Sequence, residues 1–256
     1  MIDWNPSQYL KFVKERTQPS IDLAARIEIQ DPSSVIDIGC GPGNSTAILR
    51  SKWPGAKITG LDSSPNMIER AKADYPEAEW IAGDATSFTF RNKYDIVFSN
   101  AALQWMPDHE VLLPRLYDIV AANGALAVQV PADFESPIRR AVISVSKEAR
   151  WSKYTEGCDH LLNYRTAPYY YDILSALSAK VDLWETSYYH ILSSHSDLVE
   201  WYKGTGMRPF LERLPDDSSK KSFEQEVLEG CRNGYEIRRD GKLLYPFKRV
   251  FFVAYK

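Results

Sequence analysis

The chain has 256 residues, of which 44% are hydrophobic and 25% are charged, with a formal net charge of −3. This composition is typical of a globular protein and argues against a disordered chain or an integral membrane protein. No long run of lysine or arginine is present. A nucleic-acid partner is therefore not expected, because phosphate backbones require a basic surface. The length allows one large α/β domain or two small ones.

Cysteine and histidine patterns indicate neither disulfides nor a metal site. Cys40, Cys158 and Cys231 lie far apart, and the four histidines form no metal-ligand spacing with them. We expect three reduced thiols. The N-terminal segment lacks the apolar core of a signal peptide, and no stretch approaches the length of a transmembrane helix. We therefore expect a cytoplasmic protein without a membrane partner, present as a monomer or a weak homo-oligomer.

Residues 1–31 are predicted to form N-terminal helices. Asn5-Pro6-Ser7 is typical of a helix start, because proline suits the first helical position. Helical spacing then places four residues on one face: Tyr9, Phe12, Val13 and Arg16. An arginine on an apolar face is unusual, so Arg16 is either a ligand-binding residue or an arginine whose stem is buried and whose head reaches water.

From residue 33 onward, short apolar runs alternate with helical segments. Strands are predicted over 34–38, 56–61, 79–82, 94–99 and 125–130, the last after a turn at Asn123-Gly124. Helices are predicted over 44–53 with Asn44 as the cap, from Ser64-Pro65 onward, and around 112–120, where Pro114 is expected to delay the start or to kink the helix. This alternation predicts a parallel sheet with helices on both faces.

The second half is less regular. Helices are predicted over 169–177 and 196–203, and a long strand over 181–191 is expected to pair with a final strand over 249–255. Residues 131–167 and 206–234 are predicted helical insertions that form a lid over the carboxyl edge of the sheet. No linker requires a second independent domain, so we expect a single domain over 1–256.

The sharpest motif is Asp37-Ile38-Gly39-Cys40-Gly41-Pro42-Gly43, which follows one predicted strand and precedes a helix. Glycines allow a ligand to approach the backbone, and the helix N-terminus favours negative charge. Asp62 ends the next strand, where an acidic residue usually binds ribose hydroxyls. A dinucleotide fold requires the third glycine at position 44, which is Asn44, so this alternative is disfavoured. A glycine turn without a ligand is the other alternative.

The Gly-x-Gly-x-Gly spacing, with Asp37 two residues before the first glycine, resembles motif I of class I S-adenosylmethionine (SAM) methyltransferases. Asp84 matches the acidic position that contacts the adenine amino group in these enzymes, and 100–105 follows the fourth strand, where they place the methyl-transfer site. The resemblance implies an α/β, Rossmann-like fold with a mostly parallel seven-stranded sheet whose last strand is antiparallel.

A narrower resemblance covers nearly the whole chain. It rests on the segments 3–7, 41–46, 60–67, 103–109, 170–175, 188–190 and 205–211, which together are similar to the trans-aconitate 2-methyltransferase family. Residues 133–165 match least. The resemblance implies SAM-dependent methylation of a carboxylate of a small tricarboxylate, with S-adenosyl-L-homocysteine as the second product. Methylation of another small acid or a phenolic metabolite, and a SAM-binding regulator without catalysis, remain alternatives.

We expect the cofactor to contact Arg16, Gly39, Cys40, Gly41, Asp62, Ser63, Met67, Asp84, Ala85, Asn100, Ala101 and Trp105. We expect the substrate to contact Trp4, Asn5, Tyr9, Trp105, Tyr171, His190, Arg208 and Arg249, because arginine binds carboxylates bidentately and aromatic side chains supply walls.

A carboxylate nucleophile is already ionised at neutral pH, so no catalytic base and no metal are expected. Catalysis then consists of positioning and desolvation. His109 is expected to cap a helix or to lie on the surface, and Cys40 is not expected to act as a nucleophile.

Overall fold

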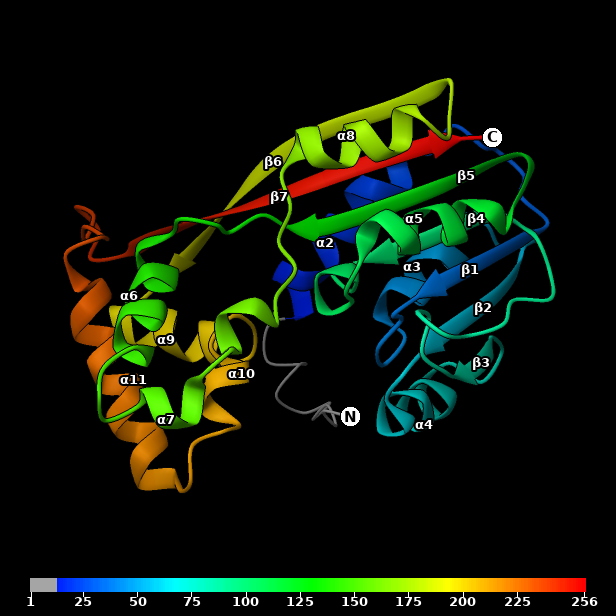
Figure 1. Cartoon of the computed structure of the whole chain (residues 1–256). Coiled ribbons are helices and arrows are strands. Elements are labelled where there is room, and N and C mark those ends of the chain that lie inside the picture. The colour runs from blue at the N-terminus through cyan, green and yellow to red at the C-terminus, as the bar shows by residue number, and fades with distance from the viewer. Residues whose placement is uncertain (1–12) are drawn as a thin grey trace. The chain divides into compact units, whose positions relative to one another are not determined.

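The structure is a computed structural model that describes residues 13–256, with only the helical backbone described for 13–16 (Figure 1). The chain divides into two compact units. The first, called the sheet unit, comprises Met1–Pro131, Arg165–Thr186 and Arg249–Lys256. The second, called the helical unit, comprises Ala132–Tyr164 and Ser187–Lys248. Each unit is described separately below.

One seven-stranded sheet carries the fold, in the order β3-β2-β1-β4-β5-β7-β6. Its strands are β1 (Ser34–Ile38), β2 (Lys57–Asp62), β3 (Glu79–Ala82), β4 (Tyr94–Asn100), β5 (Val120–Pro131), β6 (Lys180–Leu192) and β7 (Leu243–Tyr255). Pairing is parallel from β3 to β5, whereas β5 and β7 are antiparallel. The predicted sheet, its antiparallel last strand and the pairing of the last strand with 181–191 are confirmed.

The central strands are apolar because helices cover both faces of the sheet. Val35, Ile36 and Ile38 of β1 are fully buried, as are Ala125–Val128 and Val130 of β5. Helix α2 (Val13–Arg26) packs on α3 (Asn44–Lys52), and α5 (His109–Asp118) contacts α8 (Ala167–Ser175). Figure 1 shows α2 behind β5 and α8 in front of β6 and β7. Helix α4 (Pro65–Asp74) packs on β2 and β3.

Two boundary predictions are wrong. Helix α3 is preceded by Gly43 in the left-handed conformation (φ 95°), and Asn44 is its first helical residue, so Asn44 is not the cap. A Cβ on Gly43 would lie 2.7 Å from the Tyr75 ring, so the backbone approaches too closely for another residue. Helix α5 starts at His109, so Pro114 does not delay it. The predicted helix start at Ser64-Pro65 is confirmed: Ser64 caps α4, since its hydroxyl accepts from the Met67 N–H.

Two strands extend beyond their predicted starts. Strand β5 begins at Val120, and Asn123 adopts a left-handed conformation (φ 63°) inside it, which marks the predicted turn. Strand β7 begins at Leu243 rather than at Arg249. Val120 pairs with Tyr94 of β4, and β7 lies between β5 and β6, so the strand ends depend on neighbouring strands that the local pattern does not contain.

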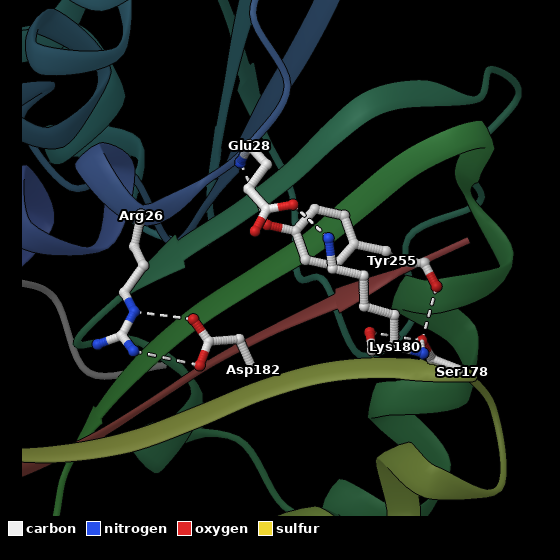
Figure 2. Close-up of polar contacts among 6 residues, drawn as sticks. All are labelled: Arg26, Glu28, Ser178, Lys180, Asp182 and Tyr255. Carbon is white, nitrogen blue, oxygen red and sulfur yellow. Dashed lines mark hydrogen bonds and ion pairs between the residues drawn. The ribbon is translucent and has the colours of Figure 1, made fainter.

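Ion pairs join α2 and the segment after it to the β6 edge of the sheet unit (Figure 2). Arg26 pairs with Asp182 at 2.8 Å, and its guanidinium lies 4.2 Å from the centre of the Trp184 ring. Lys180 pairs with Glu28, whose backbone N–H donates to the Tyr255 hydroxyl at 3.1 Å. These pairs are largely exposed, so each contributes at most about 1 kcal/mol. They connect the end of α2 and the residues after it to strand β6.

The helical unit contains α6 (Pro137–Ser146), α7 (Ser152–Thr155), α9 (His195–Lys203), α10 (Arg208–Leu211), α11 (Asp217–Arg232) and the short turn η2 (Cys158–His160). Its core is aromatic: Trp151 meets Phe223 edge to face at 5.6 Å, and Phe223 stacks on Phe210 at 6.2 Å. Helices therefore form in both predicted insertions, and their role as a lid stays a prediction. Within residues 13–256, no helix has the length and apolar character needed to cross a membrane.

A buried carboxylate lies under the start of α3. Asp37 is fully buried at the end of β1, and its Oδ2 accepts hydrogen bonds from Ser45 Oγ at 2.6 Å and Thr46 Oγ1 at 2.7 Å. Burial raises the pKa of Asp37 to about 6, although both hydroxyls act in the opposite direction. The two hydrogen bonds connect the end of β1 to the first turn of α3, and the glycine segment lies between these two elements in the chain.

The hydrogen bond from Thr46 to Asp37 should contribute most to the free energy of unfolding at high pH, where Asp37 is ionised. The folded state holds the Asp37 proton more tightly than the unfolded chain, so this group lowers stability as pH rises from about 4 to about 6. In Thr46→Val the ionised carboxylate loses one of two donors. We expect a loss of about 1.5–3 kcal/mol at pH 8 and a smaller one at pH 5, measured by urea unfolding. Thr86→Val, which removes a hydroxyl from the exposed Asp84, is the control. Equal losses at both pH values would contradict the assignment.

Candidate functional site

The glycine segment after β1 brings the backbone close to two neighbouring elements. Gly39 has φ 71°, its N–H donates to the Leu61 carbonyl at 2.7 Å, and a Cβ there would lie 2.2 Å from the Ala102 Cβ. Gly41 also has a positive φ of 54°, but a Cβ on Gly41 would meet nothing within 4 Å. Glycine is thus required at 39 for close packing, and at 41 for a left-handed turn that faces open space.

Asp62 connects this segment to the end of β2. Its Oδ2 accepts from the Gly41 N–H and its Oδ1 from the Ser64 N–H, both at 2.9 Å. Burial raises the pKa of Asp62, and the two N–H donors partly oppose that rise. Each carboxylate oxygen has two acceptor sites, so Asp62 can hold the loop and still accept hydrogen bonds from ligand hydroxyls.

A cavity of about 310 Å³ lies at the carboxyl edge of the sheet unit. Its walls are Gly39, Gly41, Leu61, Asp62, Ser63, Met67, Gly83, Asp84, Ala85, Thr86, Asn100, Ala101, Ala102, Trp105, Met106 and Pro107. The structure therefore gathers every predicted cofactor residue except Arg16 and Cys40. The walls also include residues that were not predicted, each within two positions of a predicted one: Leu61, Gly83, Thr86, Ala102, Met106 and Pro107. The volume is at the lower end of the range for small-molecule sites.

Two predicted cofactor residues are not among the cavity walls. Cys40 packs in a core cluster with Ile68, Ala71 and Trp80, and burial raises the pKa of its thiol well above the usual range. Its side chain thus points into the core between α4 and β3. Arg16 lies in α2, where only the backbone is described. Cofactor contacts by these two residues stay predictions.

A buried acceptor in the cavity wall has no partner among the described residues. Asn100 Oδ1 is buried and forms no hydrogen bond within that part of the chain. A buried polar atom without a partner is rare in native proteins and costs about 1–3 kcal/mol. A ligand that donates a hydrogen bond at this point would satisfy it. The cavity thus offers carboxylate and amide acceptors, from Asp62, Asp84 and Asn100, to a ligand that carries hydroxyl and amino donors.

A polar row runs from Asn100 across the neighbouring strands. Asn100 pairs with Gln129 in the β4–β5 register, and Arg249 pairs with Pro131 in the β5–β7 register. Paired and alternate residues point to one face of a sheet, so Asn100, Gln129 and Arg249 share a face. Arg249 is 4% exposed, and its Nη1 donates to Gln129 Oε1 at 3.1 Å. Gln129 is fully buried, and its Nε2 has no partner.

Gln129 was not predicted as a functional residue. The signal was present in the sequence, because a glutamine inside the apolar run Ala125–Val130 requires a buried amide. Its significance depends on Arg249, which lies on a strand far along the chain. The register of β5 and β7 brings the two side chains together.

The remaining predicted substrate residues are dispersed. Tyr171 on α8 is 52% exposed. Arg208 pairs with Glu212 within and just after α10, and His190 is buried among Trp201, Tyr245 and Phe247, all in the helical unit. Trp4, Asn5 and Tyr9 lie outside the described residues. Substrate contacts by these residues stay predictions, whereas Trp105 lines the cavity.

His109 is neither a cap nor a surface residue, so both predicted roles are wrong. It is 1% exposed, its Nε2 bonds to the Leu103 carbonyl at 2.8 Å, and its Nδ1 to the Tyr170 hydroxyl at 3.1 Å. Burial lowers the pKa of His109. The ring is therefore neutral and fully hydrogen-bonded, because neighbours from η1 (Leu103–Trp105) and α8 close around it.

The chain is similar to known proteins in one domain, in its whole sequence and in its fold. A family model described as a methyltransferase domain matches residues 35–124. The trans-aconitate 2-methyltransferase of Enterobacter sp. (strain 638) is 42% identical over 254 residues, which cover 99% of this chain and 98% of that protein. The protein of the same name from Escherichia coli O157:H7 (strain EC4115 / EHEC) is 39% identical with the same coverage.

Two solved structures share the fold at low sequence identity. The YcgJ protein from Bacillus subtilis aligns over 93% of this chain and 98% of its own, with a TM-score of 0.62 and 15% identity. Phosphoethanolamine N-methyltransferase 2 of Haemonchus contortus, in complex with S-adenosyl-L-methionine, aligns over 93% of this chain and 52% of its own, with a TM-score of 0.57 and 16% identity. The predicted class I methyltransferase fold is thus confirmed. With relatives 39–42% identical along almost the full length of both chains, the protein belongs to the trans-aconitate 2-methyltransferase family.

Proposed function

We propose that this protein transfers a methyl group from SAM to a carboxylate of trans-aconitate and forms a monomethyl ester. The observation that carries the proposal is the buried polar row. It joins a cavity wall with unsatisfied acceptors, at Asn100, to a buried guanidinium, at Arg249. One end of the row suits a ligand with donors, and the other suits an anion.

The residues present fit SAM. Asp62, at the end of β2, is placed to accept from ribose hydroxyls, Asp84 from the adenine amino group, and Asn100 from an ammonium. Gly39 and Gly41 keep the loop backbone accessible. When bound, SAM supplies an electrophilic methyl group: the new O–C bond forms at the acid as the S–C bond breaks, the electron pair stays on sulfur, and no proton moves.

Gln129 and Arg249 would hold a carboxylate of the substrate that does not react. The guanidinium provides several donors, and Gln129 Nε2 provides one that is not used within the protein. Because Gln129 Oε1 accepts from Arg249, the amide is oriented with its N–H groups away from that contact. An anion next to both groups would gain charge-assisted hydrogen bonds in a site shielded from water.

A base-free mechanism agrees with the state of His109. A phenolic acceptor would require a base, and both ring nitrogens of His109 are occupied by Leu103 and Tyr170. A carboxylate acceptor has a pKa of about 4 and is ionised at neutral pH without assistance. This favours an acid over a phenol as the substrate. Closure by the helical insertions, a monomeric or weakly oligomeric state and a cytoplasmic location stay predictions.

The substrate can be tested directly with methyl-labelled SAM and a panel of trans-aconitate, cis-aconitate, citrate and isopropylmalate. We expect base-labile label mainly in trans-aconitate, because the buried guanidinium selects a second carboxylate at a fixed distance and angle. Preferential labelling of another acid would show that the substrate is a different small carboxylic acid, methylated by the same reaction. SAM binding without transfer to any acid would overturn the proposal in favour of a SAM-binding regulator.

The cofactor assignment can be tested at Asp62. Asp62→Asn keeps one acceptor oxygen but loses the charge that binds two hydroxyls, so SAM affinity should fall at least tenfold, or about 1.4 kcal/mol, by calorimetry. Asp74→Asn, on the exposed face of α4, is the control and should bind SAM normally. Unchanged affinity in Asp62→Asn would remove this residue from the ribose site.

The anion site can be tested at Arg249. In Arg249→Gln the substrate loses a charged donor, worth about 1.5–3 kcal/mol, so the KM for the acid should rise roughly 10- to 100-fold while that for SAM changes little. Arg70→Gln, on exposed α4, is the matched control. Equal, small changes in both KM values would exclude Arg249 as the carboxylate ligand.

A further inference from the structure

The segment Ala101–Asp108, called the mouth segment, forms one wall of the cavity. Ala101, Ala102, Trp105, Met106 and Pro107 all line it. Within residues 13–256, Ala101 (φ 54°) and Asp108 (φ 52°) are two of the three non-glycine residues with positive φ, and they stand at the two ends of this segment. Left-handed backbone is unfavourable for such residues and persists only where surrounding contacts enforce it. The contacts that hold the mouth segment therefore determine the shape of the cavity wall.

The first half of the mouth segment is held by main-chain contacts and Gln104. The Ala101 N–H donates to the Gln129 carbonyl at 2.9 Å, and Gln104 Nε2 donates to the Ala101 carbonyl at 2.6 Å. The turn η1 closes through the Trp105 N–H, which donates to the Ala102 carbonyl at 3.0 Å. These bonds lie at the β4 end and within the turn. They do not attach the turn to α5, which follows it.

His109 provides that attachment. It is the first residue of α5 and reaches back to the Leu103 carbonyl, which also accepts from the Met106 N–H at 2.9 Å. A carbonyl oxygen only accepts, so the imidazole proton must be on Nε2. Nδ1 then carries a lone pair and accepts from the Tyr170 hydroxyl. The Leu103 carbonyl thus fixes the tautomer that donates to η1, and the Tyr170 hydroxyl, which can donate or accept, donates to the remaining ring nitrogen.

The surroundings keep this ring neutral and in place. Tyr170 is fully buried, lies against the imidazole with 5.8 Å between ring centres, and packs on Phe252 of β7 at 5.1 Å. The charged groups that act on the imidazole are Arg165 and Glu110, with opposite effects, and desolvation is the largest influence, lowering its pKa. His109 is absent from the cavity walls. It can therefore shape the site without contacting a ligand.

We propose that His109 is a positioning residue for methyl transfer: as the Nε2–H tautomer, which donates to Leu103 and accepts from Tyr170, it holds the mouth segment, and with it Trp105, against the reacting end of the cavity. The turnover part of this inference rests on the proposed function. The tautomer and the shape of the cavity do not.

The first test removes each hydrogen bond separately. His109→Leu loses both, His109→Gln keeps a donor and an acceptor on one planar group, and Tyr170→Phe removes only the hydroxyl that bonds to Nδ1. We expect kcat to fall at least tenfold in His109→Leu, with a smaller rise in the KM for the acid, and His109→Gln to recover most of kcat. Tyr170→Phe should fall between them, and adding it to His109→Leu should cause little further loss, because the two residues act as one unit.

The second test does not depend on turnover. Nitrogen NMR of the His109 ring in the wild-type protein should show the proton on Nε2, and Tyr170→Phe should change the Nδ1 resonance, which loses its hydrogen bond, while the proton stays on Nε2. Calorimetry should show weaker SAM binding in His109→Leu, by about threefold or more, at a temperature where thermal melting shows that the variant is folded. Tyr189→Phe, which removes an exposed hydroxyl on β6, is the control for Tyr170→Phe and should change neither measurement.

The outcomes separate this inference from the proposed function. If no acid is methylated by the wild-type protein, the proposed function fails, while the tautomer and SAM binding still test His109. If His109→Leu is only less heat-stable, with kcat and SAM affinity unchanged in the folded protein, a positioning role is overturned. A proton on Nδ1 alone in the wild-type ring would overturn the proposed donation from His109 to the Leu103 carbonyl.

Discussion

Parallel pairing of β1 with β2 and β4 brings the ends of these strands to one edge of the sheet, and the remaining geometry of the site depends on it. The glycine segment leaves β1, Asp62 ends β2, and Asn100 ends β4. The hydrogen bond from the Gly41 N–H to Asp62 then fixes two of these ends relative to each other at 2.9 Å. Backbone pairing, more than side-chain packing, thus sets the spacing of the groups that face the cavity.

Acidic and basic groups lie at different places along the carboxyl edge of the sheet. Carboxylates and an amide oxygen line the cavity beside β2, β3 and β4, whereas a buried guanidinium lies where β5 and β7 meet. A cationic cofactor and an anionic substrate would be separated by this division and would meet near Asn100. Their opposite charges partly neutralise as the methyl group moves, so a dry site favours the reaction.

Buried polar groups form hydrogen bonds near this edge. Asp37 anchors the first turn of α3, and Gln129 orients Arg249. His109 and Tyr170 extend the same principle to the mouth segment, whose left-handed ends need support from outside. Buried polar groups of this kind reduce stability unless each is satisfied. Their concentration around one cavity indicates that they serve the preorganisation of the site.

Local chemistry in the sequence predicted the parallel strands and the glycine segment with Asp62, and the family resemblance added the seven-stranded sheet and most of the remaining cavity residues that were predicted. Glycine spacing, strand-end acids and alternating apolar runs act over a few residues, so they can be recognised without the tertiary structure. The helix start at Ser64-Pro65 and the strand over 79–82 are examples.

Only the tertiary structure showed that Cys40 points into the core, that Gly43 and not Asn44 precedes α3, that Gln129 meets Arg249, and that His109 is enclosed by Leu103 and Tyr170. Each of these depends on residues that are distant in the chain and are brought together by strand register or helix packing. Sequence by itself thus determined the fold and the place of the site. The partners of its buried polar groups were decided by long-range contacts, because a hydrogen bond depends on where two groups meet in space.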